Sequence, residues 1–200
     1  MTLAEARPVP VLCGARVTLR PPAPADSEVA RRIGLHPEIV SGYGLELSQW
    51  RALTEEEAAE LLASLAPNAG KVEWVVAAVG DFIGTARLHS FNDPRGSAAY
   101  AVGLAAPEHL GHGLGTEITR LVSAYAFDDL GLQSLTVRVL DGNQRAIACY
   151  ARCGFVLDHR ERRALLLGGQ WSDDLVMRLD ADGFRDLRPS WTAVGDHPGM

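Results

Sequence analysis

Long apolar segments are missing from this 200-residue sequence. Its apolar runs, such as residues 74–79, are far shorter than the roughly 20 residues that a membrane-spanning helix requires. The first residues also lack the apolar core of a secretory signal peptide. We therefore expect a cytoplasmic protein with no membrane partner.

Positive charge is scarce as well, with 19 lysines and arginines against 25 aspartates and glutamates and a formal net charge of −6. Neutralising the phosphates of a nucleic acid requires a basic surface, so this balance argues against nucleic acid as a partner. Cysteine is limited to Cys13, Cys149 and Cys153, and no second Cys or His pair with ligand spacing lies nearby. We expect reduced thiols and no metal site.

A chain of this length can bury enough surface to fold as one domain without disulfides or metals. We expect an N-terminal arm at 1–15, one domain at 16–185 and a peripheral C-terminal tail at 186–200. The apolar patterns predict strands at 16–20, 73–78, 82–89, 98–105, 135–140, 155–160 and 175–179, and helices at 25–35, 54–66, 114–130 and 143–153. This order favours an α/β fold with a mixed, twisted sheet of about seven strands flanked by helices.

A glycine-rich segment, Gly111-His112-Gly113-Leu114-Gly115-Thr116, lies between an expected strand and the long helix that follows. Glycines let the backbone approach a ligand closely, and a helix N-terminus carries roughly half a positive charge, so the segment suits a phosphate group. A glycine turn that merely starts a helix is the plainer interpretation. A Walker A loop is excluded because no lysine follows the last glycine. A dinucleotide fingerprint, with Asp141 as its acid, needs the third glycine one residue later, and an NAD(P)-binding oxidoreductase stays the alternative.

The glycine segment resembles the pyrophosphate loop of the GNAT acetyltransferases, Q/R-x-x-G-x-G/A, with Leu110 in place of the usual Gln or Arg. Residues 143–155 are similar to a second signature of that family, an Asn, an Ala-Ile pair, a Tyr and a final Gly-Phe. Residues 80–84 resemble its central hairpin, and 168–177 resemble the closing hairpin of the branch that contains ribosomal-protein N-acetyltransferases. The resemblance covers about residues 15–185. It implies an acetyl-CoA-dependent N-acetyltransferase whose sheet splays between its fourth and fifth strands.

The same resemblance implies where acetyl-CoA binds. The pantetheine arm would lie in the splay against the backbone of Leu104, Ala105 and Ala106, and one of their N–H groups would face the thioester oxygen. Asn143 would cap its helix and bond the pantetheine amide. Tyr150, two helical turns later, would contact the pantetheine and protonate the leaving thiolate. The pyrophosphate would lie on the amides of Gly111, His112, Gly113, Leu114, Gly115 and Thr116.

The expected reaction is direct attack of a primary amine on the thioester in a ternary complex. The acceptor is a small-molecule amine or a protein N-terminus. Segment 41–50 is expected to border the acceptor site, with Tyr43, Glu46 and Trp50 able to hold an amine by charge and ring face. A homodimer and a non-catalytic acyl-CoA sensor on the same fold stay open. The candidate bases, which the sequence does not rank, are Glu46, His89, Tyr100 and Glu108.

Overall fold

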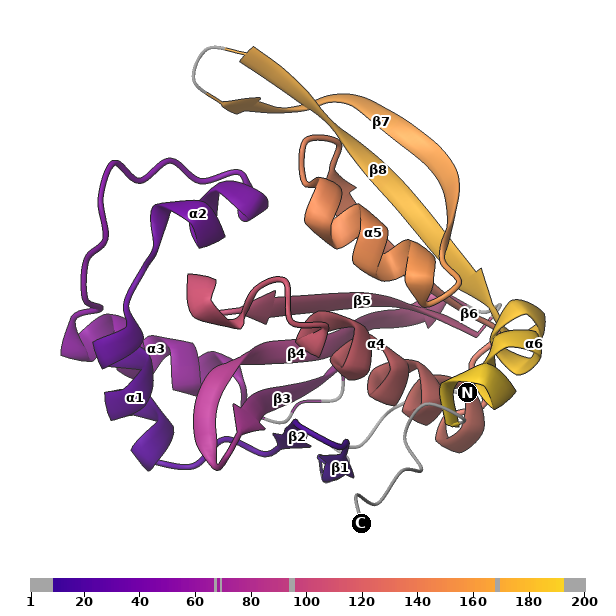
Figure 1. The fold of residues 1–200 in the computed structure, drawn as a ribbon, viewed down its shortest axis with the longest axis horizontal. Coiled ribbons are helices and arrows are strands. Elements are labelled where there is room, and N and C mark those ends of the chain that lie inside the picture. Colours follow the sequence, from indigo (N-terminus) through magenta and orange to yellow (C-terminus); the bar gives the residue numbers. More distant parts are fainter. Residues whose placement is uncertain (1–8, 67, 69, 94–95, 168–169, 193–200) are drawn as a thin grey trace.

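The computed structural model describes residues 9–192 except 67, 69, 94–95 and 168–169. Within these residues the chain forms one eight-stranded sheet in the order β1-β2-β3-β4-β5-β6-β8-β7 (Figure 1). Neighbouring strands are antiparallel except β5 and β6, which are parallel. The strands are β1 (Leu12–Cys13), β2 (Thr18–Arg20), β3 (Lys71–Ala78), β4 (Asp81–Asp93), β5 (Ser97–Leu104), β6 (Ser134–Leu140), β7 (Val156–Leu167) and β8 (Gln170–Asp180). The predicted α/β fold with a mixed sheet is confirmed.

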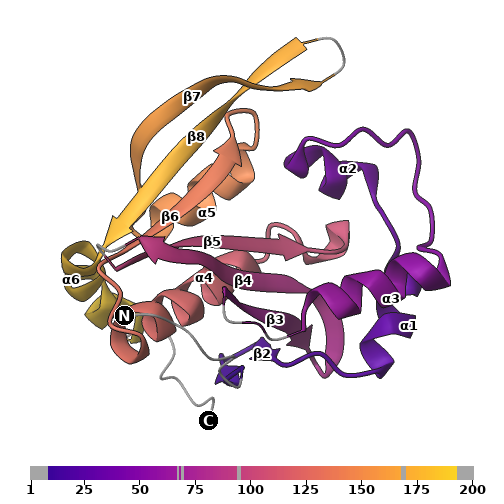
Figure 2. The ribbon, with the colours of Figure 1, turned by 180° about the vertical axis from the view of Figure 1, so that it is seen from behind.

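Helices cover both faces of this sheet. They are α1 (Ala25–Ile33), α2 (Pro37–Val40), α3 (Glu55–Ser64), α4 (Leu114–Ala124), α5 (Gln144–Arg152) and α6 (Ala181–Thr192), with 3-10 turns η1 (Ser41–Tyr43) and η2 (Pro107–His109) and a π-helical stretch η3 (Tyr125–Asp129). Trp74 and Val75 are neighbours on β3, so their side chains point to opposite faces. Trp74 lies in the larger core with Ile118 of α4, whereas Val75 packs with Ala30 and Leu65 near α1 and α3. Helices α4 and α5 therefore face the viewer in Figure 1 and lie behind the sheet in Figure 2.

Local sequence signals set several helix ends. Thr54 and Glu57 form the predicted capping box of α3, each side chain accepting from the other residue's backbone N–H at 3.1 and 2.8 Å. The helix expected over 114–130 is α4 followed by η3. Gly131 ends it with a φ of +65°, the left-handed conformation in which glycine has no Cβ penalty.

The sheet opens between β5 and β6. These strands pair only where Ser97–Ala99 meets Ser134–Thr136, while β6 stays paired with β8 along its whole length. Residues 100–104 of β5 therefore keep one backbone edge that no neighbouring strand covers. The predicted splay between the fourth and fifth expected strands is confirmed, and those strands are β5 and β6.

The described parts of the expected arm and tail contain regular structure, in β1 and α6. Strand β1, which was not among the expected strands, lies inside the expected arm and pairs with β2. It has only two residues, too few to show the alternation of apolar and polar residues that predicts a strand. The expected boundary at residue 185 falls within α6, where Phe184 is buried and stacks on Phe127 at 4.7 Å. The glycine pair of the closing hairpin lies outside the described residues.

Candidate active site

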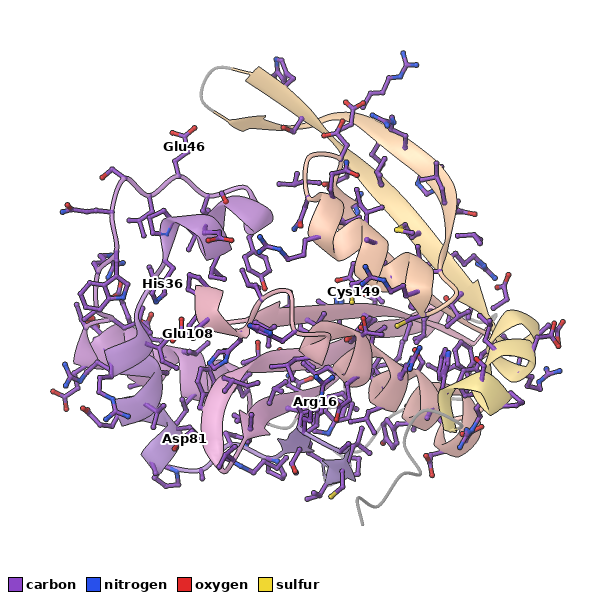
Figure 3. All side chains as sticks on the ribbon, viewed as in Figure 1. Arg16, His36, Glu46, Asp81, Glu108 and Cys149 are labelled. Carbon is purple, nitrogen blue, oxygen red and sulfur yellow. The ribbon has the colours of Figure 1, made fainter. Side chains whose placement is uncertain are left out.

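A cavity of about 1220 Å³ opens at the splay. Its wall comes from strands β4, β5, β6, β7 and β8, from α2 and η1, from the start of α4 with the loop before it, and from the facing side of α5. Figure 3 shows Cys149 of α5 in the gap between α5 and the layer of β5 and α4. The predicted cofactor residues on this wall are Leu104, Gly111, Gly113, Leu114, Gly115, Thr116, Asn143 and Tyr150.

The glycine loop forms the end of the cavity next to α4. Gly111 and Gly113 have φ values of +80° and +79°, which L side chains rarely adopt. Gly113 is the N-cap of α4 and provides no side-chain cap, so the first amides of that helix remain available to an anion. A Cβ at Gly115 would lie 3.3 Å from Cys149 Sγ, so glycine here lets α4 and α5 approach.

Arg16, near the start of the domain, hydrogen-bonds this loop from outside the cavity. Arg16 donates through Nη1 to the His112 carbonyl at 2.7 Å and through Nε to the Glu117 carboxylate at 2.8 Å. His112 itself is exposed and is not part of the cavity wall. The loop is therefore held by a contact with a residue about a hundred positions away in the sequence.

Of the three residues expected to contact the pantetheine, one lines the cavity and two do not. Leu104 lines the cavity. The Ala105 N–H already donates to the Ile83 carbonyl at 2.8 Å, and Ala106 is buried and does not line the cavity. The Ala105 N–H is thus already hydrogen-bonded within the sheet, whereas Leu104 is at the end of the uncovered edge of β5.

The N-cap of α5 and one residue within that helix lie on the cavity wall at the splay. Asn143 accepts the Ala146 N–H at 3.1 Å and so caps α5, while its Nδ2 lies next to Gly42. Tyr150 is 6% exposed, with its ring against Tyr100 and Phe155. Burial first, and then the neighbouring Cys149, raise the pKa of the Tyr150 hydroxyl, so it stays protonated at neutral pH and can donate.

Cys149 of α5 and Cys153, which follows the end of that helix, lie against the start of α4. Thr116 Oγ1 is 3.6 Å from Cys149 Sγ, and Cys153 Sγ donates to the Thr116 carbonyl at the same distance. A hydrogen bond from Cys153 lowers the pKa of Cys149, although burial opposes that shift. Cys149 thus lies beside the expected pyrophosphate site, next to Thr116. Across the residues that the structure describes, no group of three or more His, Cys, Asp or Glu could hold a metal ion.

The sheet face opposite α4 provides the other side of the cavity. Arg87 and His89 of β4 project from it, and the facing residues Ala99 and Ala101 on β5 are small. Burial first, and then the charge of Arg87, lower the pKa of His89, so its imidazole is neutral at pH 7. Nδ1 of that ring lies 2.9 Å from Ser90 Oγ.

Of the residues expected to hold the acceptor, the structure brings Tyr43 to the cavity. Its hydroxyl donates to the Val102 carbonyl at 3.3 Å and occupies the space that a Cβ at Gly103 would need. Trp50 instead donates to the Ile33 carbonyl at 2.7 Å, and Glu46 points away from the molecule in Figure 3. Neither of these two residues is on the cavity wall.

The four candidate bases differ in their burial and in whether they line the cavity. Tyr100 is fully buried, its hydroxyl lies 3.1 Å from Thr119 Oγ1, and burial raises its pKa well above the ordinary value. Glu46 and Glu108 do not line the cavity. His89 does, and it is uncharged at neutral pH.

Comparison with known proteins decides the family. Residues 16–156 match the family model described as the acetyltransferase (GNAT) domain. The chain belongs to the GNAT acetyltransferase family. The family model confirms the predictions of this family, of the N-acetyltransferase class and of acetyl-CoA as its cosubstrate. The branch that contains ribosomal-protein N-acetyltransferases stays a prediction.

Individual relatives agree with this assignment. A spermidine N(1)-acetyltransferase of Escherichia coli K12 is 28% identical over 104 residues, which are 52% of this chain and 55% of that protein. The chain thus spans about half the length of this curated relative. Two solved structures share the fold: a GCN5-related N-acetyltransferase from Brucella melitensis (TM-score 0.76, 17% identity, 98% and 95% coverage) and the spermidine N-acetyltransferase from Vibrio cholerae in complex with CoA and spermine (TM-score 0.72, 22% identity, 86% and 99% coverage).

Arg87 is among the residues on the wall of this GNAT domain that the sequence analysis did not single out. Arg87 precedes His89 by two positions, so the two share a face of β4, while Leu88 between them is fully buried. This alternation could have predicted that Arg87 and His89 lie together on the less buried face of the strand. The sequence alone does not show which open face borders the splay.

Proposed function

We propose that this enzyme transfers the acetyl group of acetyl-CoA to a small primary amine by direct attack in a ternary complex. One observation carries the proposal: the uncovered edge of β5, the start of α4 and the Tyr150 hydroxyl converge on a single cavity. The names of two relatives, which describe acetylation of spermidine, support a small-molecule amine as the acceptor. A homodimer and a cytoplasmic location stay predictions. No helix in the described part of the chain is long and apolar enough to cross a membrane.

Two residues on opposite sides of the splay carry out the proton transfers: His89 acts as the base and Tyr150 as the acid. His89 takes a proton from the acceptor ammonium, and the amine nitrogen then attacks the thioester carbon. A backbone N–H on the open edge of β5 stabilises the oxyanion that forms. As the carbon–sulfur bond breaks, the Tyr150 hydroxyl protonates the leaving thiolate, and the second proton lost by the acceptor nitrogen restores that hydroxyl. Deprotonation at pH 7 costs about 4–5 kcal/mol for an amine of pKa near 10.4 but about 1 kcal/mol for one near 8.

Two-substrate kinetics test direct attack against an acyl-enzyme. We expect intersecting initial-rate lines when acetyl-CoA and the amine are varied, and no acetylated protein when acetyl-CoA is added alone. Cys149 lies on the cavity wall and is the thiol that a covalent route would use. Parallel lines together with an acetyl group on Cys149 would show a covalent intermediate and contradict the proposed order of events.

Replacing His89 by glutamine tests the base. The native enzyme should lose kcat/KM only below pH 6.5, because the pKa of His89 lies under its ordinary value and protonation removes the base. The variant should be about 10-fold slower at pH 7 for an amine of pKa near 8, and its rate should rise until the amine itself is deprotonated.

His36→Gln is the matched control, because His36 lies near Trp50 and outside the cavity wall. It should keep the native pH profile. A His89→Gln profile that superimposes on the native one would assign the deprotonation to solvent.

A further inference from the structure

The positively charged Arg87 lies on the cavity wall beside the proposed base His89, on the sheet face opposite α4, which we call the acceptor side. Ala101 lies opposite it on β5, with Ala99 and Gly103 as the diagonal neighbours about 7–8 Å away, so no large side chain covers the guanidinium from β5. Its ion pair with Glu73 is long, at 3.8 Å from Nη1, and the other Glu73 oxygen already binds Lys71. The arginine therefore keeps hydrogen-bond donors for a ligand.

The carboxylates on the cavity wall are poorly placed to hold a polycation. Glu38 pairs with Arg145 at 2.8 Å, and Glu161 pairs with Arg138. Among the described residues the remaining acid on the wall is Asp174 of β8, which lies across the splay from Arg87. A polyamine requires several carboxylates that are free to face its nitrogens, and two of these three are already neutralised by arginine.

We propose that the acceptor of this enzyme is a primary amine that also carries a carboxylate, as an α-amino acid does, and that Arg87 binds the carboxylate. This inference rests on the proposed function. A guanidinium can bind a carboxylate through two parallel hydrogen bonds, which orients the acceptor as well as attracting it. His89 lies two residues along the same strand, about 7 Å away, so the amine of a molecule held by Arg87 can meet the imidazole and the splay.

A set of α-amino acids, their primary amides and spermidine distinguishes these acceptor classes. The native enzyme should acetylate some α-amino acids with a higher kcat/KM than the matched amides or spermidine. Arg87→Gln should raise KM for the acids about 10-fold with little change in kcat, and should change KM for the amides less than threefold; the effect is moderate because the guanidinium is half exposed. Arg87→Lys should give a KM for the acids between those of the native enzyme and Arg87→Gln. Lysine keeps the positive charge but cannot form the two parallel hydrogen bonds of a guanidinium.

Arg31→Gln is the matched control, because it removes a half-exposed arginine that pairs with Glu28 on α1 and takes no cation from the cavity wall. It should leave the preference for acids unchanged. Faster turnover of amides or spermidine by the native enzyme, or an Arg87→Gln effect equal for acids and amides, would overturn the carboxylate assignment while leaving the acetyltransferase proposal intact. Absence of turnover with every primary amine would instead defeat the proposed function itself.

Discussion

Replacing Tyr150 by phenylalanine is expected to lower kcat about 10²–10⁴-fold while acetyl-CoA binds as before. The ring stays packed against Tyr100 and Phe155, so only the hydroxyl is lost. The thiolate then leaves without a proton donor, which slows the reaction without abolishing it. Because burial raises the pKa of the native hydroxyl, the native donor should persist into alkaline solution. The measurements are steady-state kinetics, calorimetry with acetyl-CoA and thermal unfolding.

Tyr100→Phe provides the control for this substitution. Tyr100 lies beside Tyr150, but its hydroxyl faces Thr119 in the buried core. Its loss should cost about 1 kcal/mol of unfolding free energy and leave kcat within a few-fold of the native value. Undiminished kcat in Tyr150→Phe would make Tyr150 a packing residue and assign the proton to water.

Replacing Gly113 by valine is expected to weaken acetyl-CoA binding about 100-fold. A β-branched residue is strained at a φ of +79°, and its displacement would disturb the amides that are proposed to bind the pyrophosphate. Losing one or two charge-assisted hydrogen bonds has an effect of this size. Calorimetry with acetyl-CoA measures it directly.

Gly131→Val separates backbone strain from lost binding. Gly131 has a φ of +65° at the far end of the same helical segment, and a Cβ there would meet nothing within 4 Å. Both variants should therefore lose similar thermal stability, and only Gly113→Val should lose affinity. Equal affinity in the two variants would remove the glycine loop from the cofactor site.

The parts of this structure that could be predicted from sequence depend on local chemistry. The left-handed glycines before α4, the Thr54 capping box and the Asn143 cap each arise from residues a few positions apart. Such signals survive in a single sequence because neighbouring residues alone satisfy the backbone groups at a helix end. The splay followed from the family resemblance and not from any pattern in the strands.

The acceptor side could not be predicted because distant contacts create it. Arg87 borders the cavity because β4 pairs with a strand whose facing residues are small, and β6 then turns away from that strand. Tyr43 and Trp50 are seven residues apart, yet one hydroxyl reaches Val102 while the other side chain bonds Ile33. Proximity in sequence therefore gave no guide to which of them reaches the site.

Mass spectrometry of the acceptor, combined with release of the CoA thiol, tests the central claim most directly. Acetyl-CoA and a panel of primary amines, α-amino acids among them, are incubated with the enzyme. The account predicts an acceptor acetylated on nitrogen in an amount equal to the CoA released, with both signals strongly reduced in Tyr150→Phe. Tight binding of acetyl-CoA with no product from any amine would indicate the acyl-CoA sensor, and binding of NAD without CoA would indicate the oxidoreductase. Either result would contradict the account.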